Sequence, residues 1–336
     1  MLSEFAFTPS VFDENAQEDK DAWREQIREI NLAMFPRIGS WPIVISDLFE
    51  GGWSELVQSY VDNIEDHRSK TACQSLLTQG RKMLVKRPCC HDAWPGEDDA
   101  EWCREAQATD LIEPIDRIIS TRNTIDLSHE EFHKIRCLDE TNDSGFWNGI
   151  SNDSPSLKMI EQIDLLRKIC LHSEWIAFIN PYALGNELDF TEKLIRHALA
   201  KKEGFKSPHI EVHVMSPSRF DSADNESSKK KAVKNFQDCL GNNFKASNTI
   251  QIYFWPKLLD RIFIGGSFQQ DSDGKRLKAP RWGVAMNHVA RNDHSDNSTT
   301  EWKLLSKKSI LDWFYKYVSD TDRQKPTPCE LVISNE

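Results

Sequence analysis

The stretch from Lys257 to Gly266 reads KLLDRIFIGG, and a second apolar run, RWGVAMNHV, extends from Arg281 to Val289. Both runs are rich in β-branched and aromatic residues, so they predict two strands in hairpin-like succession. An Asp-Arg pair, Asp260 and Arg261, stands directly before the first run. This pair could be the remnant of a catalytic motif, part of a ligand-binding site or a structural ion pair. The sequence around it favours some of these interpretations over others.

The chain around this stretch alternates strand and helix patterns. The strand patterns are WIAFINPYAL (175–184), HIEVHVMSP (209–217) and TIQIYFWP (249–256). The helix patterns are NELDFTEKLIRHALAKKEG (186–204), KKKAVKNFQDCLGNNF (229–244) and, at the end, KKSILDWFYKYVSD (307–320). A β-α-β-α-β order, followed by two strands and a closing helix, predicts a mixed α/β sheet flanked by helices.

The first half of the chain shows mainly helical periodicity. Residues 21–35 and 51–67 place apolar side chains at helical spacing, with one short strand or turn, PIVISDLF (42–49), between them. The stretch 139–156 is dense in Asn, Asp, Ser and Gly, which is typical of a long loop. We therefore predict an α-rich α+β domain over 1–150, the mixed α/β domain over 157–320 and a C-terminal tail over 321–336.

The composition restricts the classes of partner. A net charge of −11 over 336 residues argues against a general electrostatic coat for DNA or anionic lipid, although a local basic patch remains compatible with it. No apolar run approaches the roughly 20 residues of a membrane span, and MLSEFAFTPS is not a secretory leader. The eight scattered cysteines fit reduced thiols. We expect a soluble, cytoplasmic protein.

Three pieces of the C-terminal half, DRIFIG, RWGVAMNHV and SILDWFYKYV, together with the order of elements around them, resemble a known family. The region of about 157–320 is similar to the phospholipase D-like domain at the C-terminus of MIT-domain proteins and to its bacterial, defence-associated relatives. In that family a His-Asp-Arg triplet leads into an apolar strand, and a Gly-Trp-type strand follows later. Here the triplet position, 259–261, reads Leu-Asp-Arg, and the later strand has Trp-Gly at 282–283.

The resemblance implies a protein without the family's catalytic chemistry. Active phospholipases D use a His-x-Lys motif, contributed twice, in which one imidazole attacks phosphorus and the other protonates the leaving alkoxide. No histidine of this chain has a lysine two positions later, and Leu259 replaces the histidine of the triplet. We therefore expect a non-catalytic interaction protein, without metal or cofactor, that binds a protein partner or a phosphate-bearing ligand. The bacterial relatives look like accessory components of anti-phage or conflict systems, and the resemblance implies that context here.

The candidate ligand-binding residues lie at the ends of the last strand patterns. They are Asp260, Arg261, Arg281, Trp282 and His288. Arg261 could hold a phosphate bidentately or be held by a carboxylate in a structural ion pair, and we favour the ion pair. Arg281 and Trp282 could present a guanidinium and an aromatic face to a nucleotide or a lipid headgroup, although a buried Trp beside a surface Arg is the plainer interpretation.

The main alternative is a divalent-metal phosphodiesterase or nuclease. It would use Asp260, His288, Asp293 and Glu301, because the stretch MNHVARNDHSDNSTTE is dense in potential metal ligands. Loops of this composition are commonly just solvated, so we do not predict a metal site there. A third hypothesis, direct binding to anionic membranes by analogy with the MIT-linked domains, is disfavoured by the acidic charge. The lysines of 229–234 could contact phosphates, with a solvated helix start as the default.

Two features of the first half invite functional interpretations of their own. Cys89, Cys90, His91 and Cys103 are potential zinc ligands, but no CxxC knuckle occurs, so we interpret them as ordinary loop residues. Three tryptophans in acidic or polar stretches could anchor a partner or pack into small local cores. They are Trp94, Trp102 and Trp147.

Overall fold

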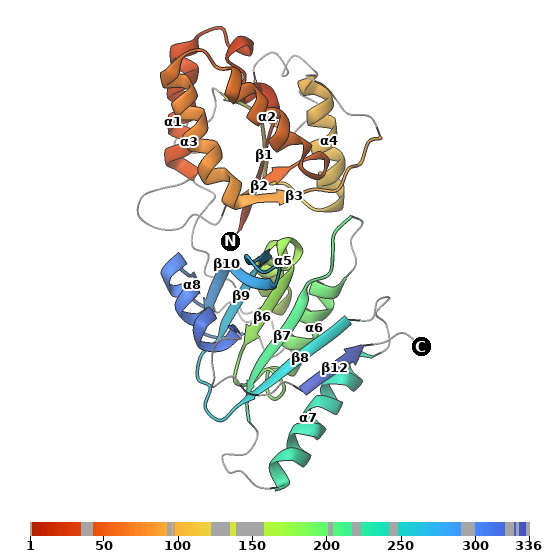
Figure 1. Ribbon diagram of the computed structural model, residues 1–336. Coiled ribbons are helices and arrows are strands. Elements are labelled where there is room, and N and C mark those ends of the chain that lie inside the picture. The colour runs from red at the N-terminus through yellow and green to blue at the C-terminus, as the bar shows by residue number, and fades with distance from the viewer. Residues whose placement is uncertain are drawn as a thin grey trace. The chain divides into compact units, whose positions relative to one another are not determined.

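The computed structural model describes residues 2–34, 43–92, 96, 98–121, 135–138, 158–200, 204–216, 223–241, 248–289, 300–319, 326 and 329–333. By its internal contacts the chain divides into two compact units (Figure 1). The N-terminal unit comprises Leu2–Ser151 and Lys202–Phe205, and the C-terminal unit comprises Met1, Asn152–Lys201 and Lys206–Glu336. The loop predicted as the domain boundary, 139–156, lies outside the described residues.

A five-stranded parallel sheet forms the middle of the N-terminal unit, in the order β3-β2-β1-β4-β5. Its strands are β1 (Ser3–Phe7), β2 (Ile43–Asp47), β3 (Leu84–Lys86), β4 (Arg117–Ser120) and β5 (Ile135–Cys137). The α-helices are α1 (Lys20–Met34), α2 (Gly52–Asn63), α3 (His67–Gly80) and α4 (Asp99–Ile112), and the 3₁₀ turn η1 (Pro9–Phe12) follows β1. From β1 the chain builds the sheet toward β3, then returns to place β4 on the other side of β1.

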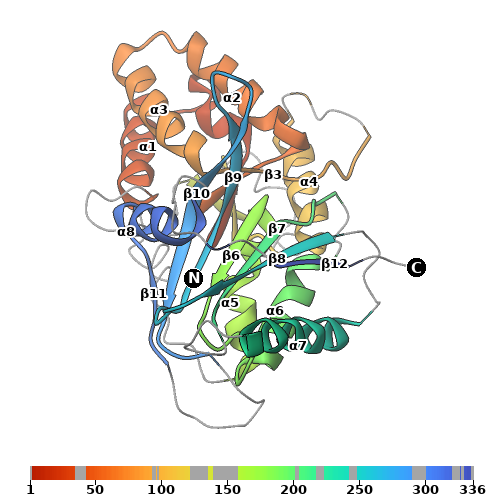
Figure 2. The same cartoon turned by 60° about the horizontal axis from the view of Figure 1, so that its bottom comes forward.

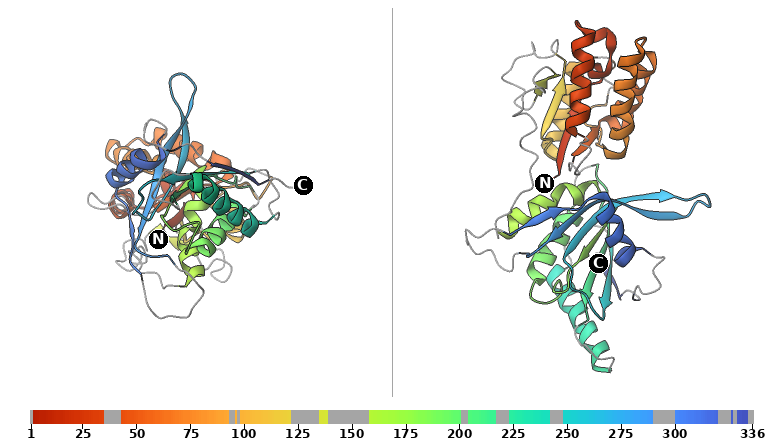
Figure 3. Two further views of the ribbon diagram at one scale, coloured as in Figure 1. Left: turned by 90° about the horizontal axis from the view of Figure 1, so that it is seen from below. Right: turned by 90° about the vertical axis from the view of Figure 1, so that its left-hand side faces the viewer.

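Helix α1 shows how the helical pattern produces the packing. Trp23, Ile27, Ile30 and Met34 recur at helical spacing and are all buried, as predicted for an amphipathic helix. The helix lies beside α3 in the views of Figures 1 and 3, and the Nδ2 atom of Asn31 donates to the Oγ of Ser75 on α3 at 3.1 Å. One face of α1 is therefore used for the core and for its helical neighbour.

The parallel sheet corrects the prediction of an α-rich α+β arrangement for this half. Strands and helices alternate along the chain, which is the α/β pattern. The prediction was wrong because the strands are only three to five residues long. Most of their residues are buried, and strands of parallel sheets show no alternation of apolar and polar residues that would reveal them.

A fully buried ion pair ties this sheet together. The Nη2 atom of Arg87, which follows β3, lies 2.7 Å from Oε2 of Glu4 on β1, and both side chains have no solvent exposure. Nε of Arg87 donates to Oε1 of Glu4 at 2.8 Å, so the contact is bidentate. The Nη1 atom donates to the backbone carbonyls of Thr109 and Glu113, at 3.1 and 2.8 Å. Arg87 thus connects two strands to the end of α4.

A seven-stranded mixed sheet forms the C-terminal unit, in the order β11-β10-β9-β6-β7-β8-β12. The strands are β6 (Trp175–Ile179), β7 (His209–Met215), β8 (Asn248–Trp255), β9 (Ile262–Gln270), β10 (Arg276–Met286), β11 (Trp302–Leu304) and β12 (Cys329–Ile333). The helices are α5 (Met159–His172), α6 (Leu188–Leu199), α7 (Ala223–Leu240) and α8 (Lys307–Trp313), and α8 continues into a π-helical turn, η7 (Phe314–Val318). β6, β7 and β8 are parallel to one another, and the other pairs are antiparallel.

Helices cover both faces of this sheet. Figure 1 shows α8 in front of the strands and α5, α6 and α7 behind them. Ala177 and Ile179 of β6 belong to the core that includes Phe314 of η7, whereas Phe178 packs against Phe190 of α6 with ring centroids 5.9 Å apart. The mixed α/β sheet flanked by helices is confirmed.

The hairpin of β9 and β10 is longer than the two predicted runs. Only the residues from Ile262 to Gly266 pair with β6, and Figures 2 and 3 show the far half of the hairpin extending beyond the neighbouring strands. A bulge between Pro280 and Trp282 shifts the register of β10. The region predicted as a tail contributes β12, which pairs with β8 in antiparallel fashion.

Candidate binding site

Arg261 stands where β9 begins, at the edge of the sheet where β6 ends, because Ile179 and Ile262 are partners across the two strands. Its Nη2 atom lies 3.3 Å from Oε1 of Glu187, whose side chain is buried. Its Nη1 atom donates to the carbonyl of Asn287 at 3.1 Å. Its guanidinium also lies 4.9 Å from the centroid of the Tyr182 ring. Arg261 therefore links the start of β9 to the segments that follow β6 and β10.

Asp260 has partners of its own on the turn η7. Tyr317 donates its hydroxyl to Oδ2 of Asp260 at 2.7 Å, and Nζ of Lys316 lies 3.2 Å from the same oxygen. Burial, and then the neighbouring Asp260 carboxylate, raise the pKa of Tyr317 well above its usual value. The Lys316 ammonium also lies 4.6 Å from the ring centroid of Trp313. The two charges of the Asp260-Arg261 pair are thus each matched by a different partner.

The other predicted site residues lie in two places. His288 is exposed and follows Asn287, so it lies beside Arg261. Arg281 and Trp282 lie at the bulge, where Trp282 is opposite Gly265. At about 3.3 Å per residue this is roughly 13 Å along the strand from Arg261. The structure therefore divides the predicted site into an Asp260-Arg261-His288 group and an Arg281-Trp282 pair.

Of the other pair, Arg281 is half-buried and Trp282 is buried. The Trp282 ring is 5% exposed, and the Arg281 guanidinium lies 4.5 Å from its centroid. Burial lowers the pKa of Arg281 to about 10, which leaves the guanidinium charged at neutral pH. This arrangement presents little of the aromatic face to a ligand.

A buried polar network on β7 was missed at the level of sequence. Glu211 and His213 are fully buried, and Oε2 of Glu211 lies 3.2 Å from Nε2 of His213. Nε1 of Trp255 donates to Nδ1 of His213 at 3.0 Å, and the Tyr253 ring stacks on the imidazole with centroids 4.7 Å apart. Because Nδ1 accepts a hydrogen bond, His213 carries its proton on Nε2 and directs it to Glu211. Lys278 of β10 forms an ion pair with Glu211.

The signal for this network was present in the alternation of β7. Ile210, Val212 and Val214 point to one face, so Glu211 and His213 share the other. The strand pattern by itself places His209 and His213 roughly 13 Å apart, too far to share one metal ion, and predicts no other role for them. It could not show that β8 and β10 supply the partners.

The two candidate metal sites, around His288 and around Cys89, were compared with the arrangement of potential ligands in the structure. Among the residues that the structure describes, no group of three or more His, Cys, Asp and Glu side chains could hold a metal ion. Asp293 of the alternative site lies outside the described residues. Of the zinc candidates, Cys89 and Cys90 are exposed while Cys103 is buried, and burial raises the pKa of Cys103 to about 12. His91 pairs through Nδ1 with Oε2 of Glu105 at 2.5 Å.

The tryptophan hypothesis is answered for one residue. Trp102 has no solvent exposure, packs edge-on against Phe49 with centroids 5.2 Å apart, and donates its indole N–H to the carbonyl of Gly96 at 3.0 Å. It belongs to the core of the N-terminal unit. Trp94 and Trp147 lie outside the described residues.

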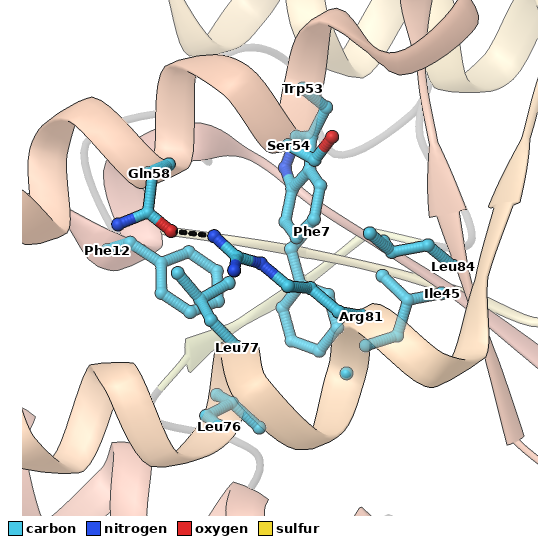
Figure 4. A pocket seen from close by; sticks show the side chains of 11 residues that line it. Phe7, Phe12, Ile45, Trp53, Ser54, Gln58, Leu76, Leu77, Arg81 and Leu84 are labelled. Atoms are coloured by element: carbon cyan, nitrogen blue, oxygen red, sulfur yellow. Dashed lines mark hydrogen bonds between the residues drawn. The ribbon is translucent and has the colours of Figure 1, made fainter. Parts of the chain in front are cut away.

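The apolar pocket of the N-terminal unit is too small for an organic ligand. It lies between α2, α3 and the sheet, and Arg81 donates to Gln58 across it (Figure 4). Its volume is about 10 Å³, which is close to the space of a single water molecule. The indole N–H of Trp53, one of the lining residues, is buried and has no hydrogen-bond partner among the residues that the structure describes.

Comparisons with known proteins identify no relative of this chain. No protein-family model matches the chain, and searches of the curated proteins and of the solved structures also find no match. Within the described ranges, none of the helices has the length and apolarity needed to cross a membrane.

Proposed function

We propose that the C-terminal unit is a non-catalytic, phospholipase D-like interaction module that binds a protein partner. The binding surface, called here the Arg261 surface, consists of Tyr182, Leu259, Asp260, Arg261 and Lys316. The main support for this proposal is the composition of the surface. Leu259 is 71% exposed and Tyr182 is 38% exposed, and they lie beside the ion pairs of Arg261 and Lys316. Exposed apolar side chains among Arg and Tyr are typical of the centres of protein interfaces.

The environment of His213 supports the non-catalytic part of the proposal. Phosphohistidine chemistry requires an imidazole nitrogen with a free lone pair that can reach phosphorus. Here Nδ1 of His213 accepts the N–H of Trp255, Nε2 faces Glu211, and the ring has no solvent exposure. A substrate would have to displace both partners to reach it.

The pairing of the charges favours a protein over a free phosphate. The Arg261 guanidinium is balanced by Glu187, and Lys316 is balanced by Asp260. A phosphate would have to compete with these carboxylates, whereas a protein surface can add apolar contacts to Leu259 and Tyr182 without breaking them. The resemblance to defence-associated relatives suggests that the partner is another component of an anti-phage system.

The test compares two exposed leucines of the same unit. Leu259→Ser combined with Lys316→Glu alters the Arg261 surface, while Leu277→Ser changes a leucine that is 44% exposed on β10, away from that surface. Full-length proteins are used as bait, and the captured proteins are identified by quantitative mass spectrometry. We expect a partner that binds the wild type and Leu277→Ser equally and is lost from the double variant.

Two results would contradict the proposal. Equal capture by all three baits would remove the Arg261 surface from binding. Hydrolysis of DNA, RNA or a phosphodiester lipid that disappears in Asp260→Asn or His213→Gln would replace the interaction module with an enzyme. The hydrolysis panel includes Mg²⁺, Mn²⁺ and Zn²⁺, so that it also tests the metal-dependent alternative.

A further inference from the structure

The edge of the mixed sheet at β12 is open to a further strand. β12 stands last in the strand order, next to β8, so among the described residues one of its edges has no neighbouring strand. Edge strands are usually protected by lysine, proline or a bulge, because their unpaired N–H and C=O groups can pair with another chain. The five residues of β12 read CELVI and include neither lysine nor proline, and their register with β8 is continuous. The backbone of β12 can therefore accept another strand.

A groove lies between this strand and helix α7. Figures 1 and 2 show α7 beside β12, and the two elements are in contact. The groove is open to solvent and has a volume of about 930 Å³. This volume is at the upper end of the roughly 300–1,000 Å³ that ligand sites occupy, so the groove is large enough for a segment of polypeptide. Its residues come from one side of α7 and from the start of β12, and they include Lys230, Lys234, Gln237, Asp238, Gly241 and Cys329.

The lysine run of α7 makes one side of this groove positive. Lys230 and Lys234 are four residues apart on the helix, so they lie on the same face, and both are exposed. Neither forms an ion pair with another residue that the structure describes, whereas Lys229 is paired with Glu226 at 2.9 Å. Of the described lining residues, only Asp238 carries a negative charge. The groove therefore favours a partner with negative charges on the side that faces α7.

We propose that the β12 edge binds an extended acidic segment of a partner protein, which adds a strand to the sheet while its carboxylates face Lys230 and Lys234. In strand addition, main-chain hydrogen bonds supply affinity and side-chain contacts supply specificity. Side chains of a strand alternate between its two faces, so the segment should carry Asp or Glu at every second position. A free phosphate or a nucleic acid could meet the lysines but could not continue the sheet. The inference does not rest on the Arg261 surface, which uses other residues of the unit.

The experiment measures the binding of two labelled peptides to the full chain by fluorescence anisotropy. The first has about eight residues in which Glu alternates with Thr, a length and composition suited to a strand. The second has proline in place of each Thr, so it keeps the charge but lacks the N–H donors that a ladder needs. We expect the Glu-Thr peptide to bind about tenfold more tightly than the Glu-Pro peptide. In its complex, the amides of Cys329–Ile333 should exchange with solvent several-fold more slowly than in the free protein.

Two double variants with the same change of net charge test the role of the lysines. Lys230→Glu combined with Lys234→Glu should weaken binding of the Glu-Thr peptide by about tenfold or more, because two attractions become repulsions. Lys231 is exposed on the same helix without lining the groove, and Lys308 is exposed on α8. Lys231→Glu combined with Lys308→Glu should therefore leave the affinity within about twofold. All four side chains are exposed, so both variants should fold like the wild type.

Several results would overturn the proposal. Wild-type protein that binds no Glu-Thr peptide at millimolar concentration would disprove the site. Equal binding of the two peptides, or unchanged amide exchange of β12, would mean that the lysines only attract negative charge. Equal losses in the two double variants would mean unspecific electrostatic attraction. A single-stranded oligonucleotide that binds more tightly than the Glu-Thr peptide, and is lost in the Lys230-Lys234 variant, would assign the groove to nucleic acid.

One further variant separates this inference from the proposed function. The double variant of the Arg261 surface, Leu259→Ser with Lys316→Glu, leaves the groove unchanged. It should bind the Glu-Thr peptide as tightly as the wild type does. A loss of peptide binding in that variant would place the peptide on the Arg261 surface and would remove the β12 edge from binding.

Discussion

Glu4 and Glu211 are both fully buried carboxylates on interior strands of their sheets, but the two units neutralise them differently. Glu4 meets the guanidinium of Arg87 in a bidentate contact, and neither side chain reaches solvent. Glu211 meets Lys278, which is 11% exposed, and the imidazole of His213. Arg remains charged at all physiological pH values, so Glu4 has a permanent cationic partner, whereas Glu211 is met by an ammonium and by the Nε2–H of an imidazole.

The Glu4 carboxylate thus has a single cationic partner, whereas the Glu211 carboxylate is stabilised by several groups. The Glu4-Arg87 contact has one charge state, and its geometry fixes the spacing of β1, β3 and α4. The Glu211 carboxylate is shared among three partners, because Lys278 and His213 contact it and the hydroxyl of Tyr253 also donates to it, at 3.3 Å. We therefore expect the loss of Arg87 to lower the free energy of unfolding more than the loss of Lys278, because Glu211 keeps other partners.

The largest effect is expected for Arg87→Met. It leaves the Glu4 carboxylate buried without its cation, and breaking one partner of a buried ion pair costs about 3–5 kcal/mol. The free energy of unfolding is measured by urea denaturation, with Arg28→Met as the control. Arg28 is 50% exposed in a surface pair with Glu25, so its loss should cost no more than about 0.5 kcal/mol.

An intermediate effect is expected for Lys278→Met, the equivalent change in the other unit. His213 and Tyr253 remain as hydrogen-bonding neighbours of Glu211, so we expect a loss of about 1–3 kcal/mol in the free energy of unfolding. Glu161→Gln, at an exposed position of α5, serves as the control in the same denaturation series. If Lys278→Met lowered the free energy of unfolding as much as Arg87→Met does, the two buried carboxylates would depend equally on their cations, and the distinction between them would be wrong.

The sequence anticipated the strands of the C-terminal unit better than the partners of its site. Runs such as WIAFI are recognisable locally, and Asp260 with Arg261 was correctly placed at a strand junction. The partner of Arg261 is Glu187, which is 74 residues away and has no local signature. Short parallel strands hid the N-terminal sheet, and the contact between the hydroxyls of Thr8 and Ser120 follows only once β1 and β4 are paired.

A smaller effect is expected for Tyr317→Phe. The substitution removes the hydrogen bond to Asp260 and should lower the free energy of unfolding by about 1 kcal/mol.

The Tyr317 ring lies edge-on to His213 with centroids 6.4 Å apart, so it joins the buried network to the Arg261 surface. We therefore expect a coupling of about 0.5 kcal/mol or more between Tyr317→Phe and Lys278→Met in a double-mutant cycle. Tyr315→Phe, at a residue 58% exposed, is the control, and strict additivity would separate the surface from the network.

The smallest effect concerns the dependence of stability on pH, and it should appear in the C-terminal unit. Burial, and then the nearby Arg167, lower the pKa of His197 on α6 below its ordinary value of 6.5. The unfolded chain therefore binds a proton more readily than the folded one. The contribution of His197 to stability is present above about pH 6.5 and is lost as the pH falls through the lower folded value.

Hydrogen-exchange protection of α5 and α6, corrected for intrinsic rates between about pH 5 and pH 8, should decrease toward acid. His197→Gln should flatten this profile, whereas His67→Gln, at an exposed position of α3, should leave it unchanged. An unaltered profile in His197→Gln would show that His197 does not cause the acid sensitivity of α5 and α6.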